Sequence, residues 1–170
     1  MRITKVELYD KYYSTYPQPA NLYKEDKEMP NHCHNRVTVY SSNTEDVAKI
    51  KQIFEDENCF GQIIPEPDWP NTPNKDGELP VKHEDPWLTY RWSNGRQDDR
   101  WYDWRVQNWD TKWDCYDVEV IDDDPEQVEI EFNTAWSPPE AICHALREQY
   151  PDLSVSWFYA EPGCEIAGYL

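Results

Sequence analysis

Residues 116–159 read YDVEVIDDDPEQVEIEFNTAWSPPEAICHALREQYPDLSVSWFY, and this stretch decides the fold. Apolar side chains alternate with acidic ones over residues 116–120. The alternation returns over residues 128–136, after a polar turn at 122–127. A period of two with one apolar side is typical of strands in a half-buried antiparallel sheet. The stretch therefore begins with a β-hairpin that has one dry face.

A helix and a further strand follow this hairpin. Ser137-Pro138-Pro139-Glu140 has the form of a capping box with proline just inside the helix start, which predicts that Ser137 caps the helix. Apolar residues then recur at helical spacing from Ile142 to Tyr150, and Pro151 ends the helix. Over residues 153–159 the apolar residues alternate again, which predicts a strand.

The region before the hairpin carries a second strand–helix pair. Residues 36–40 alternate in the manner of a strand, and Asn43 or Thr44 can cap a helix whose first turn is acidic. Helical spacing continues from Val47 to Phe54. Together with the later elements, the order is β-α-insertion-β-β-α-β, which is the split βαβ plan. The sequence therefore predicts an α+β, ferredoxin-like fold, an antiparallel sheet with two helices on one face.

The periodic positions also predict the hydrophobic core. We expect it to contain the following residues: Val37, Val39, Val47, Ile50, Phe54, Val118, Val120, Val128, Ile130, Phe132, Trp136, Ile142, Leu146, Val155 and Trp157.

Two further segments complete the organisation of the chain. Residues 1–28 form a Tyr-rich extension before a ferredoxin-like domain at 29–170. Within that domain, an insertion at about 59–113 separates the first helix from the second strand. Its first part, Cys59 to about Glu84, is rich in proline and lacks periodicity, which predicts a surface loop. Its second part is rich in Trp and Arg, and Asp98–Trp109 is predicted to be helical.

The composition indicates a folded protein with an unusual surface. A net charge of -18 is typical of disordered chains, but nine Trp and 15% aromatic residues supply the large apolar areas that a core needs. Excess negative charge disfavours contact with nucleic-acid phosphates, and it favours either solubility or a basic protein partner. No apolar run approaches the ~20 residues that span a bilayer.

Localisation is predicted from the cysteines and from the first residues. The five cysteines are widely spaced and include no CxxC pair, which favours a reducing compartment over a disulfide framework. The opening MRITKVELYD lacks the apolar core of a signal peptide. We therefore expect a cytoplasmic protein.

Four segments resemble a known family. Residues 31–39 (NHCHNRVTV) are similar to the opening of the YubB-type ferredoxin-like proteins of plasmids and phages. Residues 132–139 (FNTAWSPP) are similar to their central motif, and YPDL at 150–153 with YAEPG at 159–163 are similar to the closing ones. The resemblance implies a ferredoxin-like fold and a mobile-element origin. It transfers no catalytic residue, because the family has no established activity.

Motifs with catalytic or metal-binding spacing are scarce. His32 and His34 could begin a metal site, but the candidates to complete it, Cys143/His144 and His83, are far away in sequence. Residues 122–124 are three aspartates without the spacing of an EF-hand loop, which favours a solvated hairpin tip. We therefore expect no catalytic residue, no metal and no cofactor.

The Trp/Arg-rich part of the insertion is the first candidate interaction surface. Residues 86–113 hold six of the nine Trp and five cations against four carboxylates. Trp and Arg are favoured at interface hot spots and in base stacking, although the Trp side chains could instead form a small second core with Arg paired to neighbouring acids. The candidate residues are Trp87, Arg91, Trp92, Arg96, Arg100, Trp101, Trp104 and Arg105.

The uncovered face of the sheet is the second candidate surface. Asp117, Glu119, Glu129 and Glu131 should share this face, where like charges on adjacent strands repel each other. We expect the insertion to fold across the rim or the open face of the sheet. Arg91, Arg96, Arg100 and Arg105 would pair with the acids, and Trp side chains would supply most of the contact area. The competing hypothesis leaves the face bare as a docking surface for a basic partner.

Three classes of function follow from these features. The leading hypothesis is a non-enzymatic accessory protein that binds a protein partner. The alternative is single-stranded nucleic-acid binding through the insertion, which requires basic and aromatic residues that the hairpin lacks. An enzyme, such as a metal-dependent one, is the third.

Overall fold

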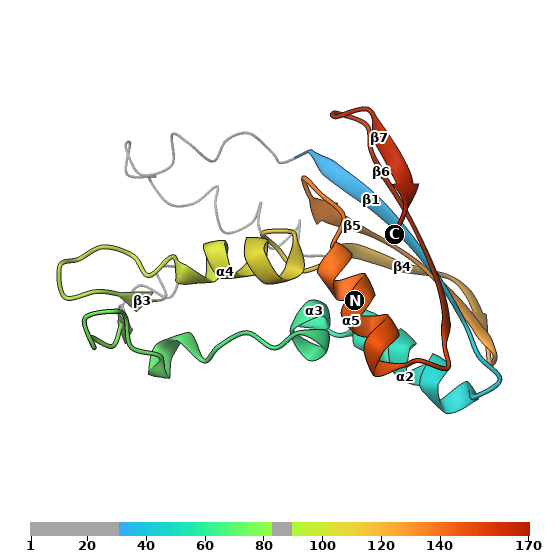
Figure 1. Ribbon diagram of the computed structural model, residues 1–170, viewed down its shortest axis with the longest axis horizontal. Helices are drawn as coiled ribbons and strands as arrows, with labels where there is room; N and C mark the ends of the chain where they lie inside the picture. The colour runs from blue at the N-terminus through green and yellow to red at the C-terminus, as the bar shows by residue number, and fades with distance from the viewer. Residues whose placement is uncertain (1–30, 83–89) are drawn as a thin grey trace, which may run out of the picture.

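A computed structural model describes residues 31–82 and 90–170 of the chain, so the predicted extension at 1–28 lies outside the described residues. Its main element is a five-stranded antiparallel sheet (Figure 1). The strands lie in the order β4-β5-β1-β6-β7, with bounds β4 Tyr116–Asp124, β5 Gln127–Ala135, β1 His32–Tyr40, β6 Ser154–Glu161 and β7 Ile166–Tyr169.

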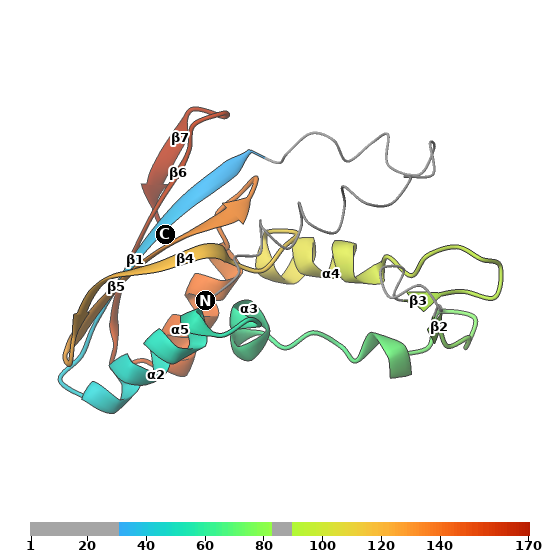
Figure 2. The ribbon, with the colours of Figure 1, turned by 180° about the vertical axis from the view of Figure 1, so that it is seen from behind.

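Two long helices cover one face of this sheet. Helices α2 (Thr44–Glu55) and α5 (Glu140–Gln149) lie on the same side of it, each connecting two strands that are not neighbours (Figures 1 and 2). This arrangement confirms the split βαβ plan. Strand β7 adds a fifth strand at one edge, beyond the predicted strands. Within the described part of the chain, no helix is both long and apolar enough to cross a membrane.

Strand β1 is the centre of the sheet. Val37 lies between Ile130 of β5 and Trp157 of β6, and Val39 is similarly flanked by two valines. Both side chains are fully buried under the helices, as the alternation predicts. The strand starts four residues earlier than predicted, because the polar residues before Arg36 also pair with β5.

The first helix follows its sequence signals. The side chain of Asn43 accepts a hydrogen bond from the backbone N–H of Glu45 and caps α2, which confirms one of the two predicted caps. The buried residues of α2 are Val47, Ile50, Ile53 and Phe54. Phe54 packs against Phe132, with ring centroids 5.2 Å apart, so the helix and the sheet share an aromatic contact.

Part of the insertion belongs to the domain core. The predicted surface loop after Cys59 is wrong at its start, because Cys59–Ile63 forms the short helix α3 and buries Cys59, Phe60 and Ile63. Phe60 contacts the rings of Trp109 and Phe132. The sequence does not indicate this helix, because five residues are too few to show the helical spacing of apolar side chains.

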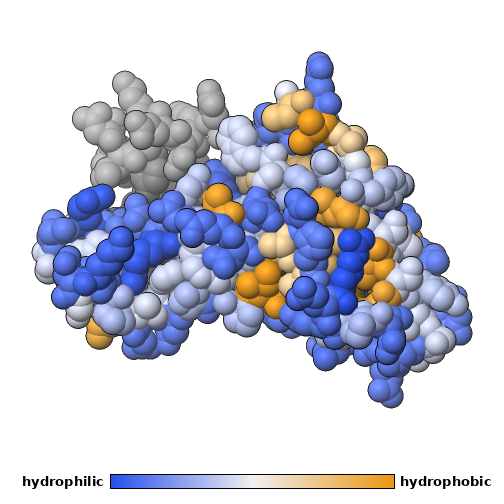
Figure 3. Space-filling model, viewed as in Figure 1, coloured by the Kyte–Doolittle hydropathy of each residue, from blue (hydrophilic) through white to orange (hydrophobic). Residues whose placement is uncertain are grey.

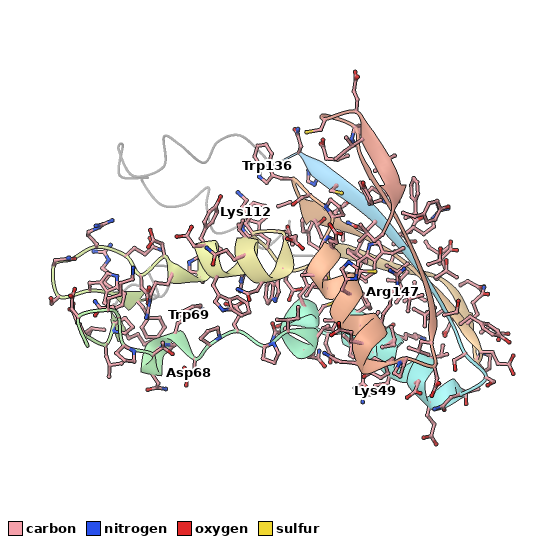
Figure 4. All side chains as sticks on the ribbon, in the orientation of Figure 1. Lys49, Asp68, Trp69, Lys112, Trp136 and Arg147 are labelled. Carbon is pink, nitrogen blue, oxygen red and sulfur yellow. The ribbon has the colours of Figure 1, made fainter. Side chains whose placement is uncertain are left out.

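The Trp136 prediction is also wrong. Strand β5 ends at Ala135, and Trp136 adopts a left-handed backbone conformation with φ of 75° and is 45% exposed (Figure 4). Its N–H donates to the carbonyl of Asn31. Because β5 ends at Ala135, the alternation does not continue to Trp136, and the indole does not enter the core.

The predicted cap at Ser137 is wrong as well. Helix α5 begins at Glu140, whose N–H donates to the carbonyl of Pro138 and is therefore not available to Ser137. The Ser137 hydroxyl instead donates to the carbonyl of Asp110. The carboxylate of Asp110 accepts the N–H of Ala141 at 2.8 Å, so a residue from the distant end of the insertion caps the helix.

The rest of the described insertion forms an arm, which we define as residues 65–82 and 90–108. It extends away from the sheet domain at the left of Figure 1. It contains the 3-10 turn η1 (Trp69–Asn71), the short strands β2 (Val81–Lys82) and β3 (Tyr90–Arg91), and most of helix α4 (Arg100–Trp109). On the face that Figure 3 shows, the arm is mostly hydrophilic, whereas hydrophobic residues gather over the sheet and its helices.

Candidate interaction surface

The face of the sheet opposite the helices carries rows of side chains that can be followed from strand to strand. In one row, Glu119 of β4 pairs with Glu131 of β5, which pairs with Arg36 of β1. In the next row, Asp122 pairs with Glu129, and Glu129 with Thr38. We call the β4–β5 part of this surface the acidic face; its carboxylates are Asp117, Glu119, Asp122, Asp124, Glu129 and Glu131.

Two irregularities in β4 place these acids. The register shifts between Tyr116 and Glu119 and again between Val120 and Asp122, and Asp117 has a φ of 53°. Such bulges re-aim side chains. They leave Val118 and Val120 packed against the core and Asp117 and Glu119 exposed. Sequence reasoning placed Asp117, Glu119, Glu129 and Glu131 here but missed Asp122 and Asp124, because the second bulge shifts their phase.

The charge of the acidic face is partly balanced by a neighbouring strand. The Nη2 atom of Arg36 lies 2.6 Å from Glu131 Oε1, and its Nε lies 3.7 Å from Glu129 Oε1. The hydrogen bond and the negative charge of Glu131 raise the pKa of the Arg36 guanidinium. Arg36 is the only Lys or Arg on this face among the residues that the structure describes, and it pairs with two of the six carboxylates.

The prediction that the insertion covers the acidic face is wrong for the described residues. Arg100 pairs with Asp98 at 2.8 Å, and Arg105 pairs with Glu66. Neither these nor any described arginine of residues 91–105 forms an ion pair with the four predicted acids. The arm leaves the domain on the helix side, away from the acidic face (Figures 1 and 2).

The other half of the open face carries two neighbouring aromatic side chains, and we call it the aromatic half. Phe158 of β6 pairs with Arg36 of β1 on one side and with Tyr169 of β7 on the other. The two rings meet edge to face with centroids 5.4 Å apart, and Tyr169 is 73% exposed. The open face thus combines a carboxylate half with an aromatic half. The alternation of residues 154–161, which places Trp157 in the core, also indicates that Phe158 lies on the open face.

The arm holds most of the predicted Trp/Arg surface residues, but it uses two arginines internally. The guanidinium of Arg100 lies between the rings of Trp69 and Trp92, and it donates to the carbonyls of Trp69, Thr72 and Pro73. Arg105 lies over Trp101 and Trp109. Trp104 contacts Trp69 and Trp109 edge to face, while Arg91 and Trp92 are half-buried and Arg96 is exposed. Trp87 lies outside the described residues.

A cleft of about 480 Å³ lies between the two chain segments that form the arm. It is lined by Glu66, Trp69, Pro70, Tyr90, Asp98, Trp101, Arg105 and Trp113. Both of its carboxylates, on Glu66 and Asp98, are already paired with arginines of the arm.

The histidine pair does not assemble the metal site that its spacing suggested. His32 Nδ1 lies 2.7 Å from the hydroxyl of Tyr116, and His34 Nε2 lies 3.8 Å from Glu131. Cys143 is buried and His144 pairs with Glu140, while His83 lies outside the described residues. Burial raises the pKa of the Cys33 thiol to about 11 and that of the Tyr116 phenol to about 12, so both groups stay protonated near neutral pH.

Comparisons with known proteins agree with this topology. Residues 108–170 match the family model described as "Ferredoxin-like domain in Api92-like protein". The structure resembles that of protein api92 from Yersinia pseudotuberculosis, with a TM-score of 0.50 and 12% identity over 83% of this chain and 93% of that one. The fold is ferredoxin-like. Within the sequence, 69 residues are 26% identical to the "Uncharacterized protein YubB" of Escherichia coli (strain K12), covering 40% of this chain and 48% of that protein. The chain thus spans about half the length of that relative.

Proposed function

We propose that this chain is a non-enzymatic protein-binding module whose acidic face docks a Lys/Arg-rich segment of a partner protein. The observation that carries the proposal is the charge of that face, which carries six carboxylates and one guanidinium among the described residues. A basic segment complements this surface, whereas a nucleic-acid backbone or an anionic lipid surface is repelled by it.

The arrangement of the acids supports a role in binding rather than in folding. Glu119 lies directly opposite Glu131, and Asp122 lies opposite Glu129. Like charges opposite each other across a hairpin destabilise it. Cations from a partner relieve this repulsion, so part of the binding free energy comes from the strain that the free protein carries.

The aromatic half of the open face supplies a second kind of contact. Phe158 and Tyr169 flank Arg36 on the side away from the carboxylates. Exposed aromatic rings bury large areas at interfaces and attract arginine side chains. A partner segment that alternates basic and apolar residues therefore matches both halves.

The setting that we propose is the cytoplasm of a bacterium that carries a mobile element. The support is the resemblance to YubB-type proteins and the five free cysteines, which suit a reducing compartment. In this setting the acidic face resembles the charge pattern of a nucleic acid and competes for basic proteins that bind one.

The test compares two variants that lose equal charge. The face variant carries Asp117→Asn, Glu119→Gln and Glu129→Gln. The control variant carries Glu57→Gln, Glu148→Gln and Asp152→Asn, three exposed acids of the helix layer. Because the face variant removes repulsion, we expect it to be at least as stable as the natural chain.

Each protein serves as bait in a bacterial lysate, and carbodiimide links carboxylates directly to partner lysines. We expect a partner that the natural chain and the control variant retain, that the face variant loses at least tenfold, and whose cross-links map to Glu119 or Glu129. Equal retention by the face variant, or equal loss from both variants, contradicts the proposal.

Single-stranded nucleic-acid binding through the insertion remains the alternative. The aromatic rings of the arm favour it, but the contacts of Arg100 and Arg105 argue against it, because both guanidinium groups are already paired with carboxylates. Fluorescence anisotropy with labelled single strands at ~50 mM salt, where phosphate contacts are strongest, decides between the two. Binding there that the variant Arg96→Met weakens supports the alternative.

A further inference from the structure

A compact group of metal-ligand residues lies where the insertion leaves and rejoins the domain. The side-chain donor atoms of Cys59, Asp114 and Cys115 all lie within 4.8 Å of one another. Cys59 is fully buried, and the other two residues are half-buried. In the part of the chain that the structure describes, no second group of three such residues reaches this proximity.

The fold holds these three side chains in place from both directions. Cys59 is the first residue of α3, and Asp114 and Cys115 directly precede β4. One oxygen of Asp114 accepts the N–H of Phe60 at 2.9 Å and the N–H of Cys115 at 2.8 Å. The carboxylate is therefore fixed by the backbone next to each cysteine, in the way that outer hydrogen bonds orient metal ligands.

The chemistry of the group suits a cation. Two thiols and a carboxylate all become anions when they lose a proton, and here they meet in a buried place. Among the described residues none of the three forms an ion pair with Lys or Arg. Without a cation, a negative charge in this cluster is stabilised by the two backbone N–H groups that donate to the Asp114 carboxylate. A divalent cation replaces the protons and is attracted by all three groups.

We propose that Cys59, Asp114 and Cys115 bind a thiophilic divalent cation, of which Zn²⁺ is the best match. Zn²⁺ takes thiolate and carboxylate ligands at about 2.0–2.3 Å, which sets tetrahedral ligands roughly 3.3–3.8 Å apart. The three donor atoms need only small side-chain movements to reach this spacing. Because Asp114 and Cys115 are half-buried, the fourth position is accessible to water.

The bound ion ties the two ends of the insertion to each other. Cys59 and Asp114 are separated by the whole arm, so a metal bridge between them closes a long loop, and the binding free energy of the ion stabilises the folded chain. No sequence spacing signals this group, because Cys59 lies far from the adjacent pair that completes it.

The experiment uses the full chain without a tag, purified in a reductant without chelator. Metal content is measured by elemental analysis, and Co²⁺ is then exchanged into the site. We expect about one equivalent of Zn²⁺ per chain, a thiolate-to-cobalt charge-transfer band in the near ultraviolet, and a lower melting temperature after a chelator is added.

Three variants test the assignment. Cys115→Ser and Asp114→Asn should each lower metal uptake at least tenfold, and both change half-buried residues that the fold can accommodate. Cys164→Ser, which changes an exposed cysteine outside the group, should bind the metal as the natural chain does. Circular dichroism of each variant confirms that it is folded.

Several outcomes overturn the proposal. They are the absence of metal uptake by the reduced protein after incubation with Zn²⁺, a cobalt complex without charge-transfer absorption, and unchanged uptake by both variants. A disulfide between Cys59 and Cys115 in the protein as purified in reductant, detected by peptide mass, also overturns it.

Discussion

In the sheet domain, Trp157 is fully buried and its indole N–H donates to Asn35, whereas in the arm Trp69 and Trp92 stay half-buried and hold the guanidinium of Arg100 between them. The domain is therefore stabilised by the removal of apolar surface from water. The arm is stabilised by contacts between rings and charges, with hydrogen bonds to its own backbone. Trp therefore stabilises the two regions through different interactions. We conclude that the two regions should respond differently to mutation and salt.

The largest expected effect lies in the domain core. Phe132 is 1% exposed and contacts Phe54, Phe60 and Trp157. Phe132→Ala should lower the free energy of unfolding by about 3–5 kcal/mol, because it leaves a cavity among three rings. Urea unfolding followed by Trp fluorescence measures this loss. A loss below about 1 kcal/mol would contradict the assigned core.

The next effect should be confined to the arm. Arg100→Met removes hydrogen bonds to three carbonyls and leaves the buried carboxylate of Asp98 without its partner. We expect a local loss of about 2–3 kcal/mol. Hydrogen exchange should speed up in Arg100–Trp109 and stay unchanged in β1. Arg96→Met, at an exposed arginine, is the matched control. Equal changes in both regions would show that the arm and the domain unfold together.

A smaller effect is expected where the insertion caps the domain. Asp110→Ala removes the acceptor for the N–H of Ala141, and alanine also disfavours the left-handed conformation at φ of 62°. The expected loss is about 1–2 kcal/mol in thermal unfolding. Asp110→Asn keeps an oxygen acceptor and tolerates this conformation, so it should cost only a few tenths of a kcal/mol. A larger loss for Ser137→Ala than for Asp110→Ala would show that Ser137, as the capping box predicts, caps α5.

The smallest effect is expected on the acidic face. Arg36→Gln should lower stability slightly in low salt, because Glu129 and Glu131 lose their shared cation. Glu119→Gln should raise stability slightly under the same conditions. Both changes should become smaller in ~1 M salt, where the Debye length falls to about 3 Å. Changes of equal size in low and high salt would point to packing instead of charge.

Periodic segments of the sequence predict the domain well. The alternations in β1, β5 and β6 place Val37, Ile130 and Trp157 in the core, because a strand with one buried face must repeat every two residues. The cap at Asn43 is equally local. Such features depend on neighbours in the chain, so the sequence carries them directly.

Features that depend on distant contacts were not predictable from the sequence. Asp110 caps α5 from the far end of the insertion. Arg36 of β1 forms an ion pair with Glu131 of the neighbouring strand β5. The proximity of Cys59 to Cys115 likewise exists only after folding. The same holds for Trp136, whose exposure follows from a turn conformation that the alternating pattern does not indicate.

The central position of β1 has a consequence for how the protein is made. Strands β4 and β5 form one hairpin and β6 and β7 another, and β1 is the strand that joins them. During synthesis, β1 leaves the ribosome long before either neighbour exists, and the whole arm is translated in between. Such non-local pairing makes folding slow. The five-stranded sheet therefore closes only after residue 169 has emerged, when β1 enters between the two hairpins and completes the core.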